Sequence, residues 1–182
     1  MVETSRHDAW QAGDSYEAYM GRWSRQVAPR FLDWLGVGEG RDWLEVGCGT
    51  GALSAAILAQ GNPRSLISID ASEGFVATAR AAVTDERADF RVGDAQALDL
   101  ATASRDVIAS ALVLNFVPDT VKAPAEMKRV TRGAGIVGFY VWDFMAAGWS
   151  SCVNSGSPQS LSILARWISR RIGVFPSARR TD

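Results

Sequence analysis

The chain has 182 residues, 47% of them hydrophobic, which suffices to bury one sizeable core and predicts a single α/β domain. Its formal net charge is −1 and no basic stripe precedes the C-terminal region, which argues against nucleic acid and favours a small-molecule partner. Two cysteines and one histidine cannot form a disulfide framework or a multi-ligand metal site, so we expect no metal.

The N-terminal region is predicted to be a helical cap. Aromatic and aliphatic side chains recur at helical spacing over residues 16–35, which predicts one or two amphipathic helices interrupted near Pro29. The chain start has no apolar signal segment, and no run approaches the roughly 18 apolar residues of a membrane span. We therefore expect a cytoplasmic protein without a membrane partner.

A glycine-rich turn follows, between a predicted strand at residues 43–46 and a predicted helix at residues 52–60. Gly47, Gly49 and Gly51 lack the Cβ atoms that would block a ligand, and they tolerate positive φ. The helix start presents unpaired N–H groups to the same space. The turn therefore predicts a site for a nucleotide-like ligand, with a tight turn that binds nothing as the alternative.

Two further strands end in carboxylates. Asp70 ends a predicted strand at Ser65–Asp70, 19 residues after Gly51, where it can accept both hydroxyls of a ribose. A helix N-cap or a solvated strand end is the alternative for this residue. Asp94 ends a predicted strand at residues 90–95 and can accept an exocyclic amine such as that of adenine, although an isolated Asp is more often a turn residue.

The remaining pattern alternates helices with strands. Helices are predicted at residues 72–83 and 118–132, and strands at residues 106–116 and 136–142. Strands alternating with helices of this length predict a doubly wound parallel sheet that binds ligands at the carboxyl ends of its strands.

Five segments share a motif pattern with a known family: LEVGCGTG at 44–51, IDAS at 69–72, GDA at 93–95, LVLNFVPD at 112–119 and EMKRV at 126–130. Together they resemble the class I S-adenosylmethionine-dependent methyltransferases, in the small-molecule branch similar to the enzymes of ubiquinone and menaquinone biosynthesis. The resemblance covers roughly residues 14–143. It implies a Rossmann-like fold, S-adenosyl-L-methionine as cofactor and a small-molecule methyl acceptor.

The resemblance also implies roles for individual residues. Glu45 would help to hold the methionine moiety, while Tyr19 and Arg22 would help to close the site. Ordinary cap packing and a solvated charge are the alternative for those last two residues. The candidate cofactor-binding residues are Tyr19, Arg22, Glu45, Gly47, Cys48, Gly49, Gly51, Asp70, Ala71, Ser72, Asp94, Ala95 and Leu112.

Methyl transfer from a sulfonium requires little acid or base catalysis. The methyl group is already electrophilic, so an aligned nucleophile and a dry pocket matter most. Cys48 invites interpretation as a nucleophile, but we interpret it as a small loop residue. His7 is the single histidine and a weak candidate for a base, so no catalytic residue is assigned.

The composition changes after Trp142. Residues 143–182 hold five arginines, two aspartates and eight serines, and nothing in them predicts the antiparallel strand pair that completes the family's sheet. One interpretation is a basic amphipathic helix over residues 160–172. The other is a tail translated out of frame, because possible codons for residues 145–157, read one base back, can encode GGGMELVREFWE, which resembles the family's continuation. The nucleotide sequence decides between them.

We therefore expect an N-terminal cap (residues 1–35), a cofactor-binding domain (36–143) and an atypical tail (144–182) that lacks the family's last strands. The predicted function is S-adenosylmethionine-dependent methyl transfer to a small organic acceptor. A non-catalytic cofactor-binding remnant of a truncated enzyme is the alternative. A nicotinamide-dependent oxidoreductase ranks lower, because its turn usually reads GxGxxG. The sequence leaves the acceptor and the oligomeric state open.

Overall fold

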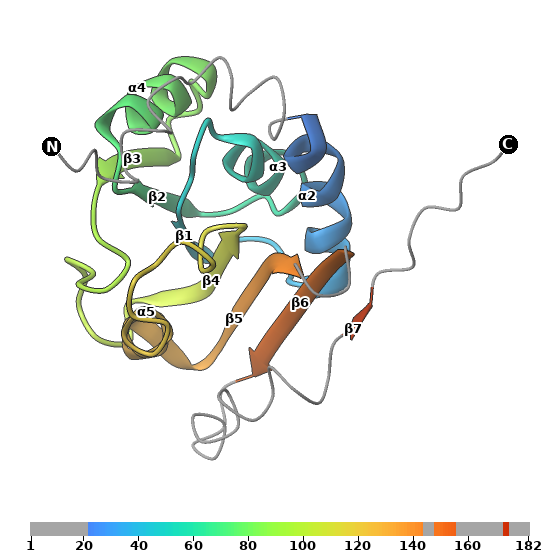
Figure 1. Cartoon of the computed structure of the whole chain (residues 1–182). Helices are drawn as coiled ribbons and strands as arrows, with labels where there is room; N and C mark the ends of the chain where they lie inside the picture. Colours follow the sequence, from blue (N-terminus) through green and yellow to red (C-terminus); the bar gives the residue numbers. More distant parts are fainter. Residues whose placement is uncertain (1–21, 144–147, 156–172, 175–182) are drawn as a thin grey trace, which may run out of the picture.

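The structure is a computed structural model that describes residues 22–143, 148–155 and 173–174. Helices and strands alternate along most of this length (Figure 1). In chain order they are α2 (Arg22–Leu35), β1 (Asp42–Val46), α3 (Ala52–Gln60), β2 (Ser65–Asp70), α4 (Glu73–Ala82), β3 (Ala88–Val92), β4 (Arg105–Ala111), α5 (Lys122–Val130), β5 (Thr131–Asp143), β6 (Gly148–Ser155) and β7 (Gly173–Val174).

The strands form one sheet in the order β3-β2-β1-β4-β5-β6-β7. The first five strands in this order pair in parallel. β1 lies at their centre, and its Glu45 pairs with Ser68 of β2 and Ala109 of β4. From β1 the chain runs outward to β3 and then returns to continue on the other side through β4. This reversal creates a topological switch point at the carboxyl ends of β1 and β4, the usual ligand position in doubly wound folds. The predicted Rossmann-like α/β fold is therefore confirmed.

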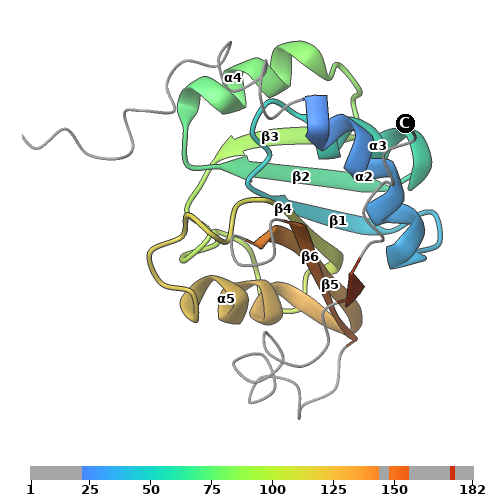
Figure 2. The same ribbon diagram turned by 45° about the vertical axis from the view of Figure 1, so that its right-hand side comes forward.

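Helices cover both faces of the sheet. Figure 2 shows α2, α3 and α4 on one side of it and α5 on the other. Under α2 and α3, Phe31, Ile57 and Tyr140 belong to one fully buried cluster. Under α5, Met127 packs with Ile108 and other residues of the central strands. Burial on both faces explains why the central strands are nearly continuous apolar runs.

The described part of the N-terminal region is a single helix. We expected an interruption near Pro29, but α2 continues through this residue. The neighbouring Ala28, Phe31 and Leu35 are buried against the sheet, and tertiary packing of this face offsets the hydrogen bond that a proline cannot make. Residues 1–21, including Tyr19 and His7, lie outside the described residues.

Several predicted boundaries need correction. The third strand was expected to reach Asp94 but ends at Val92, because Gly93 to Ala97 form a turn in which the Ala97 N–H donates to the Asp94 carbonyl at 3.0 Å. The fourth strand was expected to reach Phe116 but ends at Ala111, because Leu112 adopts a φ of 61° and leaves the ladder.

The described tail residues also depart from expectation. We predicted no strand after Trp142, yet β6 pairs antiparallel with β5 along its whole length and β7 pairs with β6. The sequence GWSSCVNS of β6 has weak strand propensity, so its conformation depends on the open edge that β5 offers. The helix expected over residues 160–172 lies outside the described residues.

Candidate functional site

The glycine turn has the left-handed backbone that its sequence predicts. Gly47, Gly49 and Gly51 have φ values of 80°, 51° and 89°. A Cβ atom on Gly47 would overlap the Val113 side chain, so glycine is required there for space as well as for conformation. The N–H groups of Gly47 and Cys48 both donate to the Ile69 carbonyl, at 2.7 and 2.9 Å. The turn is therefore fixed to the end of β2.

Asp70 ties this turn to the start of α4. Its Oδ2 accepts a hydrogen bond from the Gly49 N–H at 2.9 Å, and its Oδ1 accepts one from the Ser72 N–H at 2.9 Å. Ser72 is the N-cap of α4, because its hydroxyl accepts from the Phe75 N–H at 3.4 Å. Asp70 is thus not the helix cap, and its half-buried carboxylate lies against the turn. Ala71, which lies between Asp70 and Ser72 in the sequence, is exposed.

Glu45 lies beneath the turn rather than on its surface. It has no exposed surface, and its Oε2 accepts hydrogen bonds from the hydroxyls of Ser54 on α3 and Ser68 on β2, the latter at 2.8 Å. The other carboxylate oxygen, Oε1, is buried without a hydrogen-bond partner. Burial raises the pKa of Glu45 to about 7, with the charge of Asp70 acting in the same direction. Its contact with a methionine moiety stays a prediction.

Cys48 is a packing residue. Its side chain is 5% exposed and lies in a small apolar cluster with Val76, Ala79 and Phe90. Burial and the neighbouring carboxylates of Glu45 and Asp70 raise the pKa of its thiol far above the usual range. A thiol that stays protonated is a poor nucleophile, which agrees with the interpretation of Cys48 as a small loop residue.

Leu112 contributes to the site through its backbone. Its φ of 61° is rare for a leucine, and its side chain is 3% exposed within the core under α2 and α3. The Leu112 N–H donates to the Tyr140 carbonyl at 2.8 Å, which fixes the strained residue to β5. The left-handed turn at Leu112 directs the chain to Val113 and so over Gly47.

Asp94 is exposed in the turn after β3. Its Oδ1 accepts from the Gln96 N–H at 2.8 Å and from the Gln96 side-chain amide at 3.2 Å, while Gln96 in turn accepts from the Asp119 N–H at 3.1 Å. These bonds link the β3 turn to the segment ahead of α5. Ala95 packs at the margin of the core under α5. An adenine contact at Asp94 and Ala95 stays a prediction.

The structure thus links the glycine turn through Asp70 to Ser72, while Ser54 and Ser68 hold Glu45 separately beneath the turn. Arg22 is the first residue of α2, and Tyr19 lies outside the described residues. Sequence reasoning missed Ser54, Ser68 and Val113, which support Glu45 and Gly47. The two serines interrupt otherwise apolar segments, and that interruption is the signal that could have identified them.

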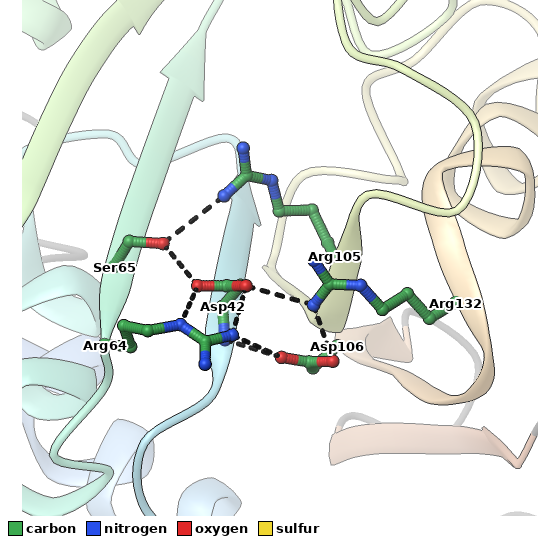
Figure 3. Close-up of polar contacts among 6 residues, drawn as sticks. All are labelled: Asp42, Arg64, Ser65, Arg105, Asp106 and Arg132. Carbon is green, nitrogen blue, oxygen red and sulfur yellow. Dashed lines mark hydrogen bonds and ion pairs between the residues drawn. The ribbon is translucent and has the colours of Figure 1, made fainter.

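A second polar cluster lies at the opposite end of the sheet, where the strands begin (Figure 3). Asp42 accepts from Arg64 at 2.9 and 2.5 Å, from the Ser65 hydroxyl at 2.9 Å and from Arg132 at 3.0 Å. Hydrogen bonds from Arg64, above all, hold the pKa of Asp42 well below its usual range. Asp106 accepts from the Asp42 N–H at 2.9 Å. The cluster joins β1, β2, β4 and β5 far from the glycine turn and has a structural role.

Arg105 belongs to the same cluster. Its Nη1 donates to the Ser65 hydroxyl at 3.4 Å, and its Nε is buried without a partner. Burial of this side chain within the cluster lowers the pKa of the guanidinium.

The described residues contain neither a candidate metal cluster nor a candidate membrane-spanning helix. No group of three or more His, Cys, Asp or Glu side chains there is arranged to hold a metal ion. Within the same ranges, no helix combines the length and apolar character needed to cross a membrane.

The fold and the turn define a doubly wound domain with a candidate ligand site at the carboxyl ends of β1 and β2. The profile of a family described as a methyltransferase domain matches residues 44–139, which is more than half of the chain. The chain therefore belongs to this family of methyltransferase domains, as the motif resemblance predicted. The comparisons give no support to the oxidoreductase alternative.

Curated relatives agree with this assignment. Over 138 residues the chain is 30% identical to malonyl-[acyl-carrier protein] O-methyltransferase of Serratia marcescens, an alignment that covers 76% of this chain and 51% of the relative. It is 29% identical over 136 residues to demethylmenaquinone methyltransferase of Halalkalibacterium halodurans, covering 72% and 54%. The chain thus spans about half the length of these relatives.

A solved structure shares the fold. Phosphoethanolamine N-methyltransferase 2 of Haemonchus contortus, in complex with S-adenosyl-L-methionine, superposes with a TM-score of 0.60 at 22% identity. The match covers 64% of this chain and 28% of that one.

Proposed function

We propose that this chain binds S-adenosyl-L-methionine at the carboxyl edge of the sheet and transfers its methyl group to a small organic acceptor. The observation that carries the proposal is the bond between the Gly49 N–H and Asp70, because it brings the ribose-binding candidate against a turn in which every second residue lacks a Cβ atom. Family membership gives the reaction class, and the related fold that holds S-adenosyl-L-methionine supports the choice of cofactor.

The residues fit such a ligand. Both oxygens of Asp70 accept backbone hydrogen bonds, and a carboxylate oxygen can accept more than one, so these bonds are compatible with a sugar hydroxyl as a further donor. The N-cap of α3 is Gly51, which has no side chain to satisfy the first N–H groups of the helix, and these groups favour electron-rich ligand atoms. Bound here, the cofactor would supply an electrophilic methyl group, and the protein would supply alignment and exclusion of water.

The acceptor is proposed only by class. The two relatives carry the names of a malonyl-[acyl-carrier protein] O-methyltransferase and a demethylmenaquinone methyltransferase, so acceptors differ within the family. In the segment between β4 and α5, Phe116 and Val121 are 54% and 74% exposed, which favours an acceptor with an apolar part.

Two measurements test the proposal. Calorimetric titration of the folded protein with S-adenosylhomocysteine should give saturable binding, and absence of binding would reject the cofactor site. Incubation with methyl-labelled cofactor and a panel of acyl and quinone-type acceptors should then transfer label. Binding without transfer to any acceptor would favour the alternative, a non-catalytic cofactor-binding remnant.

A further inference from the structure

Glu45 is a buried acid without a cationic partner. The described residues contain two buried acidic side chains, Asp42 and Glu45. Asp42 is paired with Arg64 and Arg132, whereas Glu45 receives hydrogen bonds only from serine groups. Buried charges in proteins are normally paired, so an unpaired one in a candidate site calls for a functional explanation.

The elements packed around Glu45 supply no positive charge. The residue of α3 that contacts Glu45 is Ser54, and α3 contains no charged residue. On β4 the residue paired with Glu45 is Ala109. On β2 the neighbours are Ser68 and the acidic Asp70. Cys48 is the remaining titratable group nearby, and burial keeps its thiol neutral. Within the part of the chain that the structure describes, the groups around Glu45 are therefore neutral or negative.

Charges around the turn also interact with one another. Asp70 raises the pKa of Glu45, and both carboxylates, after burial itself, raise the pKa of the Cys48 thiol. A charge placed at the turn is therefore expected to act on Glu45 as well. The hydrogen bond from Ser54 anchors Glu45 to the first turn of α3, so the acid lies directly beneath the ligand-facing backbone.

We propose that the missing counter-charge of Glu45 is the sulfonium of the bound cofactor, so that Glu45 releases a proton to solvent when the cationic cofactor binds. This inference rests on the proposed function. In this proposal Glu45 is a positioning and specificity residue that favours S-adenosyl-L-methionine over S-adenosylhomocysteine. The sulfur of S-adenosylhomocysteine is a neutral thioether, so it offers Glu45 no positive charge. The amino-acid and nucleoside parts of both molecules are the same, so comparing the two isolates the sulfonium charge.

Cofactor binding and the deprotonation of Glu45 are expected to favour each other. A nearby positive charge lowers the pKa of Glu45 in the complex, so binding is coupled to proton release between that lowered value and about 7. The preference for the sulfonium therefore grows as the pH rises to about 7 and then becomes constant. A lowering by one pKa unit corresponds to a tenfold change in relative affinity.

The experiment is calorimetric titration of the full chain with each molecule at pH 6 and pH 8, in two buffers of different ionisation enthalpy. We expect the ratio of the two affinities to rise about tenfold with pH, and proton release to accompany S-adenosyl-L-methionine alone. Glu45→Gln should remove both effects. If both molecules bind with a ratio independent of pH, the inference is wrong while the proposed cofactor site survives. If neither binds, both proposals are wrong.

Two serine variants provide a second test of the proposal if Glu45→Gln does not fold. Ser68→Ala removes a hydrogen bond that stabilises ionised Glu45, so the pH midpoint of the affinity ratio should move upward. Ser110→Ala is the matched control, because this equally buried serine donates to the Val46 carbonyl instead, at 2.8 Å. Equal midpoints in the two variants would contradict the role of Glu45.

Discussion

Val113 occupies the space that a side chain on Gly47 would need. The two residues belong to the segments that follow β4 and β1, the strands that flank the topological switch point. Close packing between these segments requires glycine at one position and a left-handed Leu112 ahead of the other. The shape of the candidate site is therefore determined jointly by two strand ends that lie far apart in the sequence.

Gly47→Ala is expected to destabilise the fold and to abolish binding of S-adenosylhomocysteine. An alanine at a φ of 80° costs about 1 kcal/mol, and its Cβ overlaps Val113 as well. Adding Val113→Ala removes both Cγ atoms but keeps the Val113 Cβ, 2.7 Å from the new Cβ, so it should recover only part of the steric loss and none of the conformational loss. Urea unfolding of both variants measures the two contributions. Gly133→Ala is the control, since a Cβ there meets nothing within 4 Å, and equal losses at both glycines would contradict this account.

Asp70→Asn is expected to lower the affinity for S-adenosylhomocysteine by tenfold or more. Asparagine has one acceptor oxygen, so either the Gly49 or the Ser72 N–H would face an amide donor. Calorimetric titration gives the change in affinity. The exposed Asp99→Asn should bind like the parent protein. Unchanged affinity in Asp70→Asn would show that this carboxylate does not hold the ribose.

Glu45→Gln is expected to be more stable than the parent protein at pH 8 when no ligand is present. The folded-state pKa of Glu45 is about 7 against 4.5 for the free side chain, so the folded state binds more protons between these values. The free energy of unfolding of the parent should therefore fall from pH 5 to pH 7. The variant should lack this fall, with a gain on the order of 3 kcal/mol at pH 8. Urea unfolding across pH measures it, and exposed Glu86→Gln should retain the slope.

Asp42→Asn is expected to destabilise the fold at pH 7 by on the order of 2 kcal/mol, because it removes the negative charge that pairs with Arg64 and Arg132 and one of the two acceptor oxygens of the cluster. The pKa of Asp42 is lowered in the folded state, chiefly by Arg64, so its contribution is present above the ordinary aspartate pKa and is lost as the pH falls below it. The variant should therefore lose less stability than the parent on acidification. Asp89→Asn, an exposed partner of Arg91, should differ from the parent by less than about 0.5 kcal/mol.

Local patterns predicted the elements next to the site. The bounds of α3 and β2 agree with expectation, because an amphipathic or apolar segment there ends at a glycine or a carboxylate. The sequence of β4 predicted a longer strand, because the apolar run continues past the residue where the backbone turns. An apolar sequence indicates which residues are buried, not where a strand ends. Leu112 is still buried, although β4 ends at Ala111.

Contacts between distant segments could not be predicted. The support of Glu45 by Ser68 depends on the register between β1 and β2, and the position of β6 depends on the free edge of β5. Even the start of α5 depends on such detail, since Asp119 accepts from the N–H groups of Val121 and Lys122 and delays the helix beyond its predicted start. Single-residue propensities contain none of this information.

The two ends of the sheet differ in how they are held. Ion pairs among Asp42, Arg64, Asp106 and Arg132 clamp the amino ends of four strands, whereas the glycine turn is held to the carboxyl end of β2 by backbone N–H groups that donate to Asp70 and Ile69. Local opening is therefore expected to cost least at the candidate site. Amide hydrogens of the glycine turn should exchange with solvent well before those of the clamped strands, which would let the proposed cofactor enter while the rest of the domain stays folded.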